Sequence, residues 1–119
     1  MTKISATSIF SSVIEILNKK TLTSLDNFVS QEIEYWDPST GKTIGIGELD
    51  KKLVAFWIDH PKCVITIDVI VGKKDLVVAE LSFPGYEVDE EKSLIFSTVV
   101  CTLDSDKITK IKNYFDPHS

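Results

Sequence analysis

The order in which hydrophobic periodicity changes along this chain constrains its fold more than any other feature. Apolar residues recur at spacings of three and four in three segments, which predicts helices over 5–18, just after Thr23 or Ser24, and over 48–58. Two short segments between them, 32–37 and 43–46, alternate like strands. Beyond residue 60 only strand-like alternation remains, in four segments separated by turn residues: 62–71, 75–83, 93–103 and 107–115. Helices early and strands late predict an α+β fold, with a curved antiparallel sheet that carries the helices on one face.

Length and charge exclude several classes of protein. With 119 residues and neither a linker nor a repeat, the chain is predicted to be one domain over 1–119. Its net charge is -5 and its basic residues are 13 lysines without an arginine, so we expect no nucleic acid partner, because phosphate binding needs a basic patch. No segment approaches the roughly 18 apolar residues of a membrane span, and no signal peptide is visible. We therefore expect no membrane partner and a cytoplasmic location.

The cysteines and histidines do not form a metal-binding pattern. Cys63 and Cys101 both lie in apolar alternating segments, where small core residues are expected. A zinc site needs more ligands at close spacing, and the chain has no C-x-x-C and only two histidines. His60 precedes Pro61 at the end of a predicted helix and is interpreted as a solvated loop residue. We therefore predict no metal and no cofactor.

Asp37 is the residue that most suggests chemistry. It ends a predicted strand, between Trp36 and Pro38, and proline cannot continue a central ladder. Apolar surroundings there would raise the pKa of the carboxyl group toward that of a useful general base. Tyr35 and Ile33 share the face of Asp37, so a phenol lies near the acid and is predicted to donate to an oxyanion. The structural alternatives are an Asp that caps a turn with its side chain and a tyrosine packed in the core.

Two further polar residues interrupt apolar strands. Asn113 shares its strand face with Thr109, Ile111 and Phe115, so its amide needs a partner and is predicted to orient a water or polarise a carbonyl. A satisfied structural amide is the alternative. Glu80 alternates with apolar neighbours and is either an exposed acid on a half-buried sheet or an acid in a pocket.

The element order and three sequence segments resemble the NTF2-like superfamily, in particular its SnoaL-like, ketosteroid isomerase-like and limonene epoxide hydrolase-like branches. The first segment runs through 14–18 into 25–28. The second, 34–38, leads through Gly45-Ile46-Gly47 into a helix, and the third covers 106–116. The resemblance implies a cone, in which the sheet wraps around three helices and leaves a cavity open at one end. It also implies a homodimer that pairs through the outer face of the sheet, expected here to hold Tyr114, Val99 and Cys101.

The resemblance assigns only part of a catalytic site. Asp37 falls on the position of the general base in ketosteroid isomerases, an enzyme class that serves as a standard example of pKa tuning. The family's helix tyrosine falls near Val13, and its protonated acid falls near Thr98. The last-strand acid of the epoxide hydrolases falls on Asn113. Both catalytic constellations are therefore incomplete in this chain.

Two functional hypotheses follow. The first is a small enzyme that isomerises, cyclises or hydrolyses an apolar carbonyl or ring compound, with Asp37 as general base and Tyr35 and Asn113 as polar partners. The predicted pocket residues are Ile33, Thr98, Trp57, Phe96, Phe115 and Glu80. The second is a non-catalytic module on the same scaffold, for binding a small ligand or for dimerisation, because a fold does not imply a function. A third reading is an adaptor that uses its acidic surface.

Overall fold

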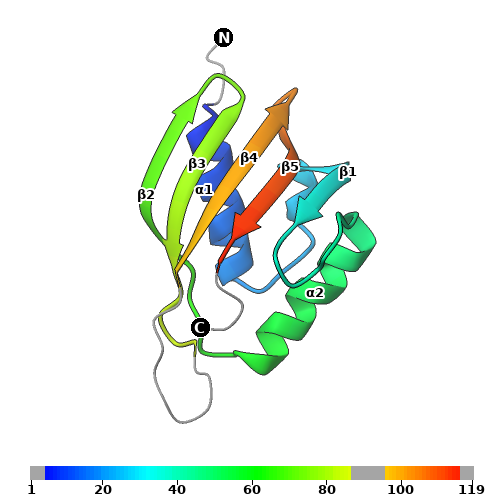
Figure 1. Ribbon diagram of the computed structural model, residues 1–119, viewed down its shortest axis with the longest axis vertical. Helices are drawn as coiled ribbons and strands as arrows, with labels where there is room; N and C mark the ends of the chain where they lie inside the picture. Colours follow the sequence, from blue (N-terminus) through cyan, green and yellow to red (C-terminus); the bar gives the residue numbers. More distant parts are fainter. Residues whose placement is uncertain (1–4, 87–95, 116–119) are drawn as a thin grey trace.

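The computed structural model describes residues 5–86 and 96–115, and these form two α-helices packed against a five-stranded mixed sheet (Figure 1). The sheet order is β1-β5-β4-β3-β2. In chain order the elements are α1 (Ala6–Asn18), a short 3-10 helix η1 (Leu25–Asn27), β1 (Val29–Trp36), α2 (Ile46–Asp59), β2 (Thr66–Lys73), β3 (Leu76–Ser82), β4 (Phe96–Asp104) and β5 (Lys107–Tyr114). The α+β class predicted from the periodicity is confirmed.

Helix α1 covers one face of the sheet and forms much of the core. Its N-terminus is capped by Ser5, whose hydroxyl accepts a hydrogen bond from the backbone N–H of Ser8 at 3.2 Å. The buried stripe consists of Ile9, Phe10, Val13 and Ile14. This stripe lies against β2, β3 and β5, so the apolar face that the spacing predicted is the face that packs on the sheet.

The three strands β3, β4 and β5 alternate between a buried inner face and an outer face. Val77, Ala79, Val99, Cys101 and Ile108 point inward to the helices and are almost fully buried. Two tight hairpin turns set this register, Lys74-Asp75 between β2 and β3 and Ser105-Asp106 between β4 and β5. The second turn has φ values of 52° and 66°, the left-handed conformation that matches the twist of a two-residue hairpin.

This alternation corrects the prediction of which side chains lie on the outer face of the sheet. Val99 and Cys101 lie on the buried inner face, whereas Tyr114 is exposed. The outer face carries a different group of apolar side chains from five strands: Trp36, Val71, Val78, Phe96, Val100 and Tyr114. Trp36 and Tyr114 contact each other across the β1–β5 pair, with ring centroids 5.4 Å apart.

Several predicted elements differ from those observed. The sheet is mixed, because β1 pairs in parallel with β5, and the parallel direction was not predicted. The helix expected after Thr23 is a single 3-10 turn, and Val29 begins β1. The expected strand 43–46 is reduced to one bridge between Tyr35 and Ile44. Of the expected strand 93–103, the first three residues lie outside the described part of the chain, as does Asp116 of the last motif.

Helix α2 packs against β1 and lies below it in the view of Figure 1. It begins after Gly45 and ends at Asp59, before His60 and Pro61. Leu49, Leu53 and Phe56 lie on its inner side. No helix in the described ranges is long and apolar enough to cross a membrane.

Candidate active site

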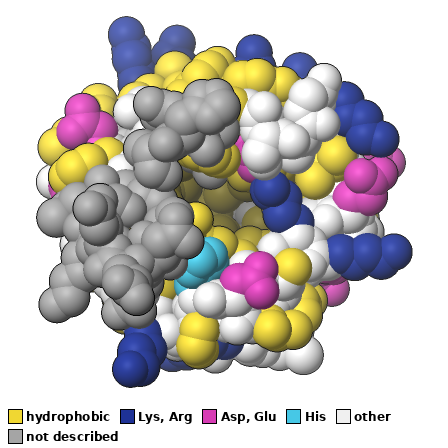
Figure 2. Space-filling view, turned by 60° about the horizontal axis from the view of Figure 1, so that its bottom comes forward, with side chains coloured by type: hydrophobic (Ala, Val, Ile, Leu, Met, Phe, Trp, Pro, Cys, Tyr) yellow, Lys and Arg dark blue, Asp and Glu magenta, His cyan; other side chains and the backbone are white. Residues whose placement is uncertain are grey.

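A cavity of about 540 Å³ lies between α1, α2 and the inner face of the sheet. Most of its lining is apolar and includes Phe10, Val13, Leu53, Phe56, Val99 and Phe115. Figure 2 shows the hollow with hydrophobic side chains on its walls and basic, acidic and histidine side chains near its rim. A largely apolar pocket with a few convergent polar groups is the usual form of a small-molecule site.

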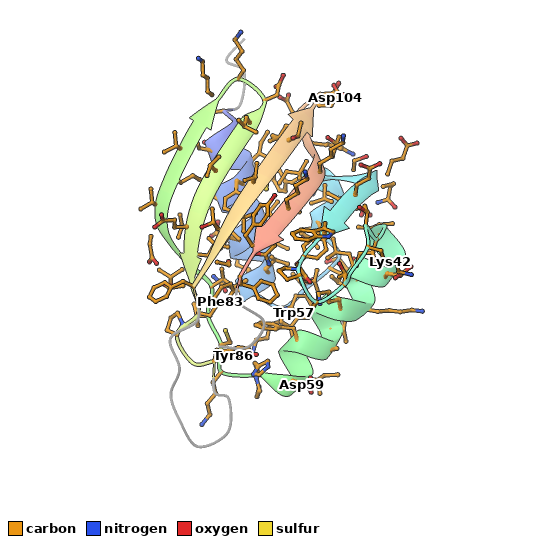
Figure 3. All side chains as sticks on the ribbon, viewed as in Figure 1. Lys42, Trp57, Asp59, Phe83, Tyr86 and Asp104 are labelled. Carbon is orange, nitrogen blue, oxygen red and sulfur yellow. The ribbon has the colours of Figure 1, made fainter. Side chains whose placement is uncertain are left out.

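The rim on the α2 side carries a cluster of aromatic rings. The rings of His60 and Tyr86 stack with centroids 4.0 Å apart, and Phe56 lies 5.1 Å from His60. Figure 3 labels Phe83 and Tyr86 in the segment that follows β3, and Asp59 at the end of α2, and all three line the cavity. The expectation that His60 is a freely solvated loop residue is therefore corrected, because it is half-buried and lines the cavity.

Asp37 lies at the cavity wall, immediately after β1, and its side chain is 0% exposed. Its Oδ1 accepts hydrogen bonds from the backbone N–H of Ser39 at 2.7 Å, from the Ser39 hydroxyl at 2.6 Å and from the backbone N–H of Thr40 at 3.0 Å. This is the turn-capping role that was the structural alternative for this residue. Asp37 therefore builds the turn after β1 with one oxygen and leaves the other for different partners.

The second oxygen of Asp37 joins a chain of polar side chains across the cavity wall. Oδ2 accepts a hydrogen bond from the Tyr35 hydroxyl at 2.7 Å and lies 3.3 Å from the Nζ of Lys52. The Tyr35 oxygen in turn accepts from Nδ2 of Asn113 at 3.1 Å. The structure thus brings together the three residues proposed from the sequence as a catalytic group, and adds a lysine to them.

The pKa of Asp37 lies below its ordinary value of 3.8, and this corrects the expectation of a raised value. Burial alone raises the pKa, but hydrogen bonds from Ser39 and Tyr35 and the positive charge of Lys52 outweigh it. The apolar walls were foreseen, but the number of donors gathered around the carboxylate was not. Asp37 is therefore ionised at every pH near neutrality.

Tyr35 stays neutral, because burial raises the pKa of its phenol, and the neighbouring charge of Asp37 adds to this effect. The sequence had suggested that the Tyr35 phenol donates to an oxyanion. In the structure its proton is donated to Asp37 instead, so the phenol is not a free donor. Its role in this arrangement is to connect Asp37 with Asn113.

Two buried polar atoms at the cavity have no hydrogen-bond partner among the described residues, Oδ1 of Asn113 and Oγ of Ser97. Buried polar atoms in proteins are nearly always paired, so each exception calls for an explanation. Both residues line the cavity. The side-chain amide of Asn113 is therefore only partly hydrogen-bonded. Its nitrogen donates to Tyr35, whereas its oxygen has no partner among the described residues.

The other predicted pocket residues divide by strand face. Phe115 lines the cavity as expected. Phe96 is 60% exposed and lies with Thr98 and Glu80 on the outer face of the sheet, so these three do not line it. The reason is the register of β4, in which Ser97 and Val99 point inward. Ile33 is buried in the core and Trp57 belongs to α2, and neither is among the lining residues.

Three site residues were missed from the sequence: Lys52, Ser39 and Ser97. Lys52 carried a readable signal, since it stands three residues after Leu49 and four before Phe56, on the apolar stripe of α2. Ser97 also carried a signal, because it stands two residues before Val99 and therefore shares the strand face of Val99. Ser39 gave no signal beyond being a common turn residue.

No group of three or more His, Cys, Asp or Glu side chains suited to a metal ion occurs within residues 5–86 and 96–115. Cys63 and Cys101 are both buried as free thiols, which agrees with the core role expected for them.

The sequence matches no protein-family model, and no curated protein sequence matches it significantly. Its structure is similar to a SnoaL-like polyketide cyclase from Agrobacterium tumefaciens, with a TM-score of 0.82 and 18% identity over 98% of this chain and 94% of that chain. It is similar to an NTF2-like protein of unknown function from Cytophaga hutchinsonii (TM-score 0.77, 16% identity, 98% and 95% covered). It is also similar to an epoxide hydrolase of M. tuberculosis (TM-score 0.70, 15% identity, 95% and 84% covered). These likenesses show that the chain has the NTF2-like fold.

Proposed function

We propose that this protein is an enzyme that binds an apolar, uncharged ring or polyketide-like molecule and removes a proton next to a carbonyl, with Asp37 as the proton acceptor. The observation that carries the proposal is a buried carboxylate, held ionised at the wall of an apolar cavity. The likeness of the fold to a polyketide cyclase and an epoxide hydrolase supports the reaction class, as an analogy between folds.

The lowered pKa of Asp37 limits which proton it can take. A carboxylate of low basicity removes only a proton that is already acidic, such as one between two carbonyl groups. In this step the C–H bond breaks, its proton binds Oδ2 of Asp37, and the electron pair of the bond passes into an enolate. A cyclisation follows when that enolate carbon attacks another carbonyl of the same molecule: the π pair of that carbonyl passes to its oxygen, which takes the proton held by Asp37 and so restores the carboxylate. The proposed substrate is therefore a 1,3-dicarbonyl rather than a simple ketone.

Lys52 covers Oδ2 of Asp37, and its movement lets a substrate reach that oxygen. Oδ1 is filled by the turn, and Tyr35 is fixed by burial, whereas the Lys52 side chain is 38% exposed and can move. When a substrate displaces it from Oδ2, the ammonium group remains next to the reacting atoms. There it stabilises the negative charge that develops on the enolate oxygen, in the way a fixed cation stabilises an oxyanion.

The test uses hydrogen–deuterium exchange at the acidic carbon of a ring 1,3-dicarbonyl, methyl 1-oxotetralin-2-carboxylate, followed by NMR. We expect the protein to accelerate exchange of this compound and not of 1-tetralone, which lacks the second carbonyl. Asp37→Asn should lower the acceleration by about 10²- to 10⁴-fold, the usual contribution of a general base. The matched control is Glu80→Gln, an acid on the outer face of the sheet, which should keep it. Acceleration that persists in Asp37→Asn would refute the assignment of the base.

A second candidate function is a non-catalytic module that binds the same class of ligand. The observation that favours it is the full hydrogen bonding of Asp37, since three donors on Oδ1 are what a structural turn requires. Binding of the dicarbonyl compound without any acceleration of its exchange, in the unaltered protein, would select this candidate.

We further propose that two copies pair through the outer face of the sheet. The support is the row of exposed apolar side chains there, which includes Val71, Val78, Phe96 and Tyr114. Soluble monomers rarely expose large contiguous apolar patches.

A further inference from the structure

The polar chain at the cavity wall fixes the direction of each hydrogen bond within it. Asp37 is a carboxylate and cannot donate, so the proton in its 2.7 Å contact with Tyr35 must come from the phenol. The phenol then has no proton left for Asn113, at 3.1 Å, and must accept one from the amide nitrogen. The orientation of the Asn113 amide therefore follows from the charge of Asp37, two hydrogen bonds away.

This orientation turns the oxygen of Asn113 into an unpaired acceptor. Its Oδ1 has almost no solvent contact and no partner in the described part of the chain. An amide oxygen accepts hydrogen bonds and cannot donate them. Only a group with an O–H or N–H satisfies it.

Ser97 supplies a second unpaired atom on the same side of the sheet. The register pairs Val99 with Asn113, so Ser97 lies on the neighbouring strand, diagonally across from Asn113 and on the same inner face. Its side chain is 96% buried, since its exposed fraction is 4%. A hydroxyl both donates and accepts, so Ser97 is able to complete the hydrogen bonding of an oxygen whose proton is given to Asn113.

We propose that Asn113 and Ser97 form the polar recognition point of the cavity, and that it selects a neutral ring compound bearing a hydroxyl group. The ligand hydroxyl donates to Oδ1 of Asn113 and accepts from Oγ of Ser97, while the ring fills the apolar cavity. An ether or a ketone at the same place has no proton to donate and leaves the amide oxygen unpaired. This inference rests on the proposed function for the site, and narrows its substrate class to hydroxylated rings, enols included.

The test compares 2-naphthol with 2-methoxynaphthalene, which differ in whether the oxygen carries a proton. Binding is measured by calorimetry and by naphthol fluorescence, both independent of any reaction. We expect 2-naphthol to bind about tenfold more tightly, the effect of one hydrogen bond of ordinary strength. Ser97→Ala should weaken the binding of both compounds, because the oxygen of either one can accept from its hydroxyl, and the matched control Thr98→Ala, on the outer face of the same strand, should leave both affinities unchanged.

Tyr35→Phe tests the orientation of the amide itself. Without the phenol oxygen, Asn113 is free to rotate and offer its nitrogen, so the preference for 2-naphthol over its methyl ether should fall toward one. A merely structural role for Tyr35 would weaken the binding of both compounds and leave their ratio unchanged. Circular dichroism checks that each variant remains folded.

Equal affinity for the two compounds, or no binding of either, would overturn the inference. The proposed function fails in a different way, through an absence of deuterium exchange. Selective binding of 2-naphthol by a protein that accelerates no exchange would leave the recognition point standing and remove the catalytic step.

Discussion

Replacing Asp37 by Asn is the sharpest test of the energetics of the site. Asparagine keeps the size and one acceptor oxygen of the aspartate, so the turn bonds from Ser39 and Thr40 can be retained. It loses the charge that holds Tyr35 and Lys52 on Oδ2. The sign of the effect follows from the pKa of Asp37, because a pKa below the ordinary value means that the folded protein favours the ionised carboxyl over a neutral group.

The magnitude can be estimated from the two contacts that are lost. A hydrogen bond to a charged group contributes about 1.5–3 kcal/mol, which applies to Tyr35. The pair with Lys52 contributes at most about 1 kcal/mol, because the lysine is 38% exposed and screened by solvent. We therefore expect Asp37→Asn to lower the free energy of unfolding by about 1.5–4 kcal/mol at pH 7. For a domain of this size the melting temperature should fall by about 6–16 °C.

The dependence on pH separates this explanation from a simple packing defect. Above the ordinary pKa of 3.8, Asp37 is ionised in both the folded and the unfolded chain, and its contribution to stability is complete. As the pH falls below that value, the unfolded chain takes up a proton first and the contribution is lost. Urea unfolding of both proteins should give a constant difference from pH 8 to about pH 5, and a smaller one below pH 3.8.

The control is Glu80→Gln, which removes an acid from the exposed face of β3 and should change stability by no more than about 0.5 kcal/mol. A variant Asp37→Asn as stable as the unaltered protein at pH 7 would contradict the reasoning. So would a difference in stability that stayed the same at pH 3.

Three further predictions follow from the same structure. Lys52→Met should raise the pKa of Asp37 toward its ordinary value, seen in a carboxyl NMR titration, and cost at most about 1 kcal/mol of stability; an unchanged titration would show that Lys52 does not act on it. Cys101 should not react with Ellman's reagent at pH 8 until urea unfolds the chain, because burial raises the pKa of its thiol to about 12 and the thiolate is the reactive form; rapid labelling of the folded protein at Cys101 would disprove this. Val78→Lys should convert the proposed dimer into a monomer in light scattering, whereas Ile58→Lys on α2 should not, and a monomeric unaltered protein would rule out the dimer.

The sequence predicted those parts of the fold that depend on local pattern. The apolar stripe of α1, the inner side of α2 and the tight turn at Ser105-Asp106 all follow from spacing or turn chemistry over a few residues. The parallel pairing of β1 with β5 joins segments about seventy residues apart, and no local pattern contains its direction. The strand faces of β4 were assigned partly by analogy, so Thr98 was placed inward where Ser97 belongs.

The candidate site shows the same division. Asp37, Tyr35 and Asn113 were identified from strand alternation and resemblance, and the structure places them in one hydrogen-bonded chain. The pKa of Asp37 was predicted in the wrong direction, because apolar neighbours are visible in a sequence, whereas the gathering of the Ser39 and Tyr35 side chains, the Lys52 charge and backbone N–H groups around one carboxylate is not. The two N–H groups that bind its Oδ1 belong to Ser39 and Thr40, and any residue in that turn except proline would provide them.

The parallel pairing of β1 and β5 also has a consequence for how the protein is made. Tyr35 and Asn113 are 78 positions apart, and the strand that carries Asn113 is the last one in the described chain. During synthesis, α1, α2 and the β2–β3 hairpin emerge and can begin to pack while β1 still lacks its neighbour in the sheet. Closing so large a loop is entropically costly, and contacts of high sequence separation slow folding. The hydrogen bond between Tyr35 and Asn113 thus cannot form until β5 has emerged and joined β1.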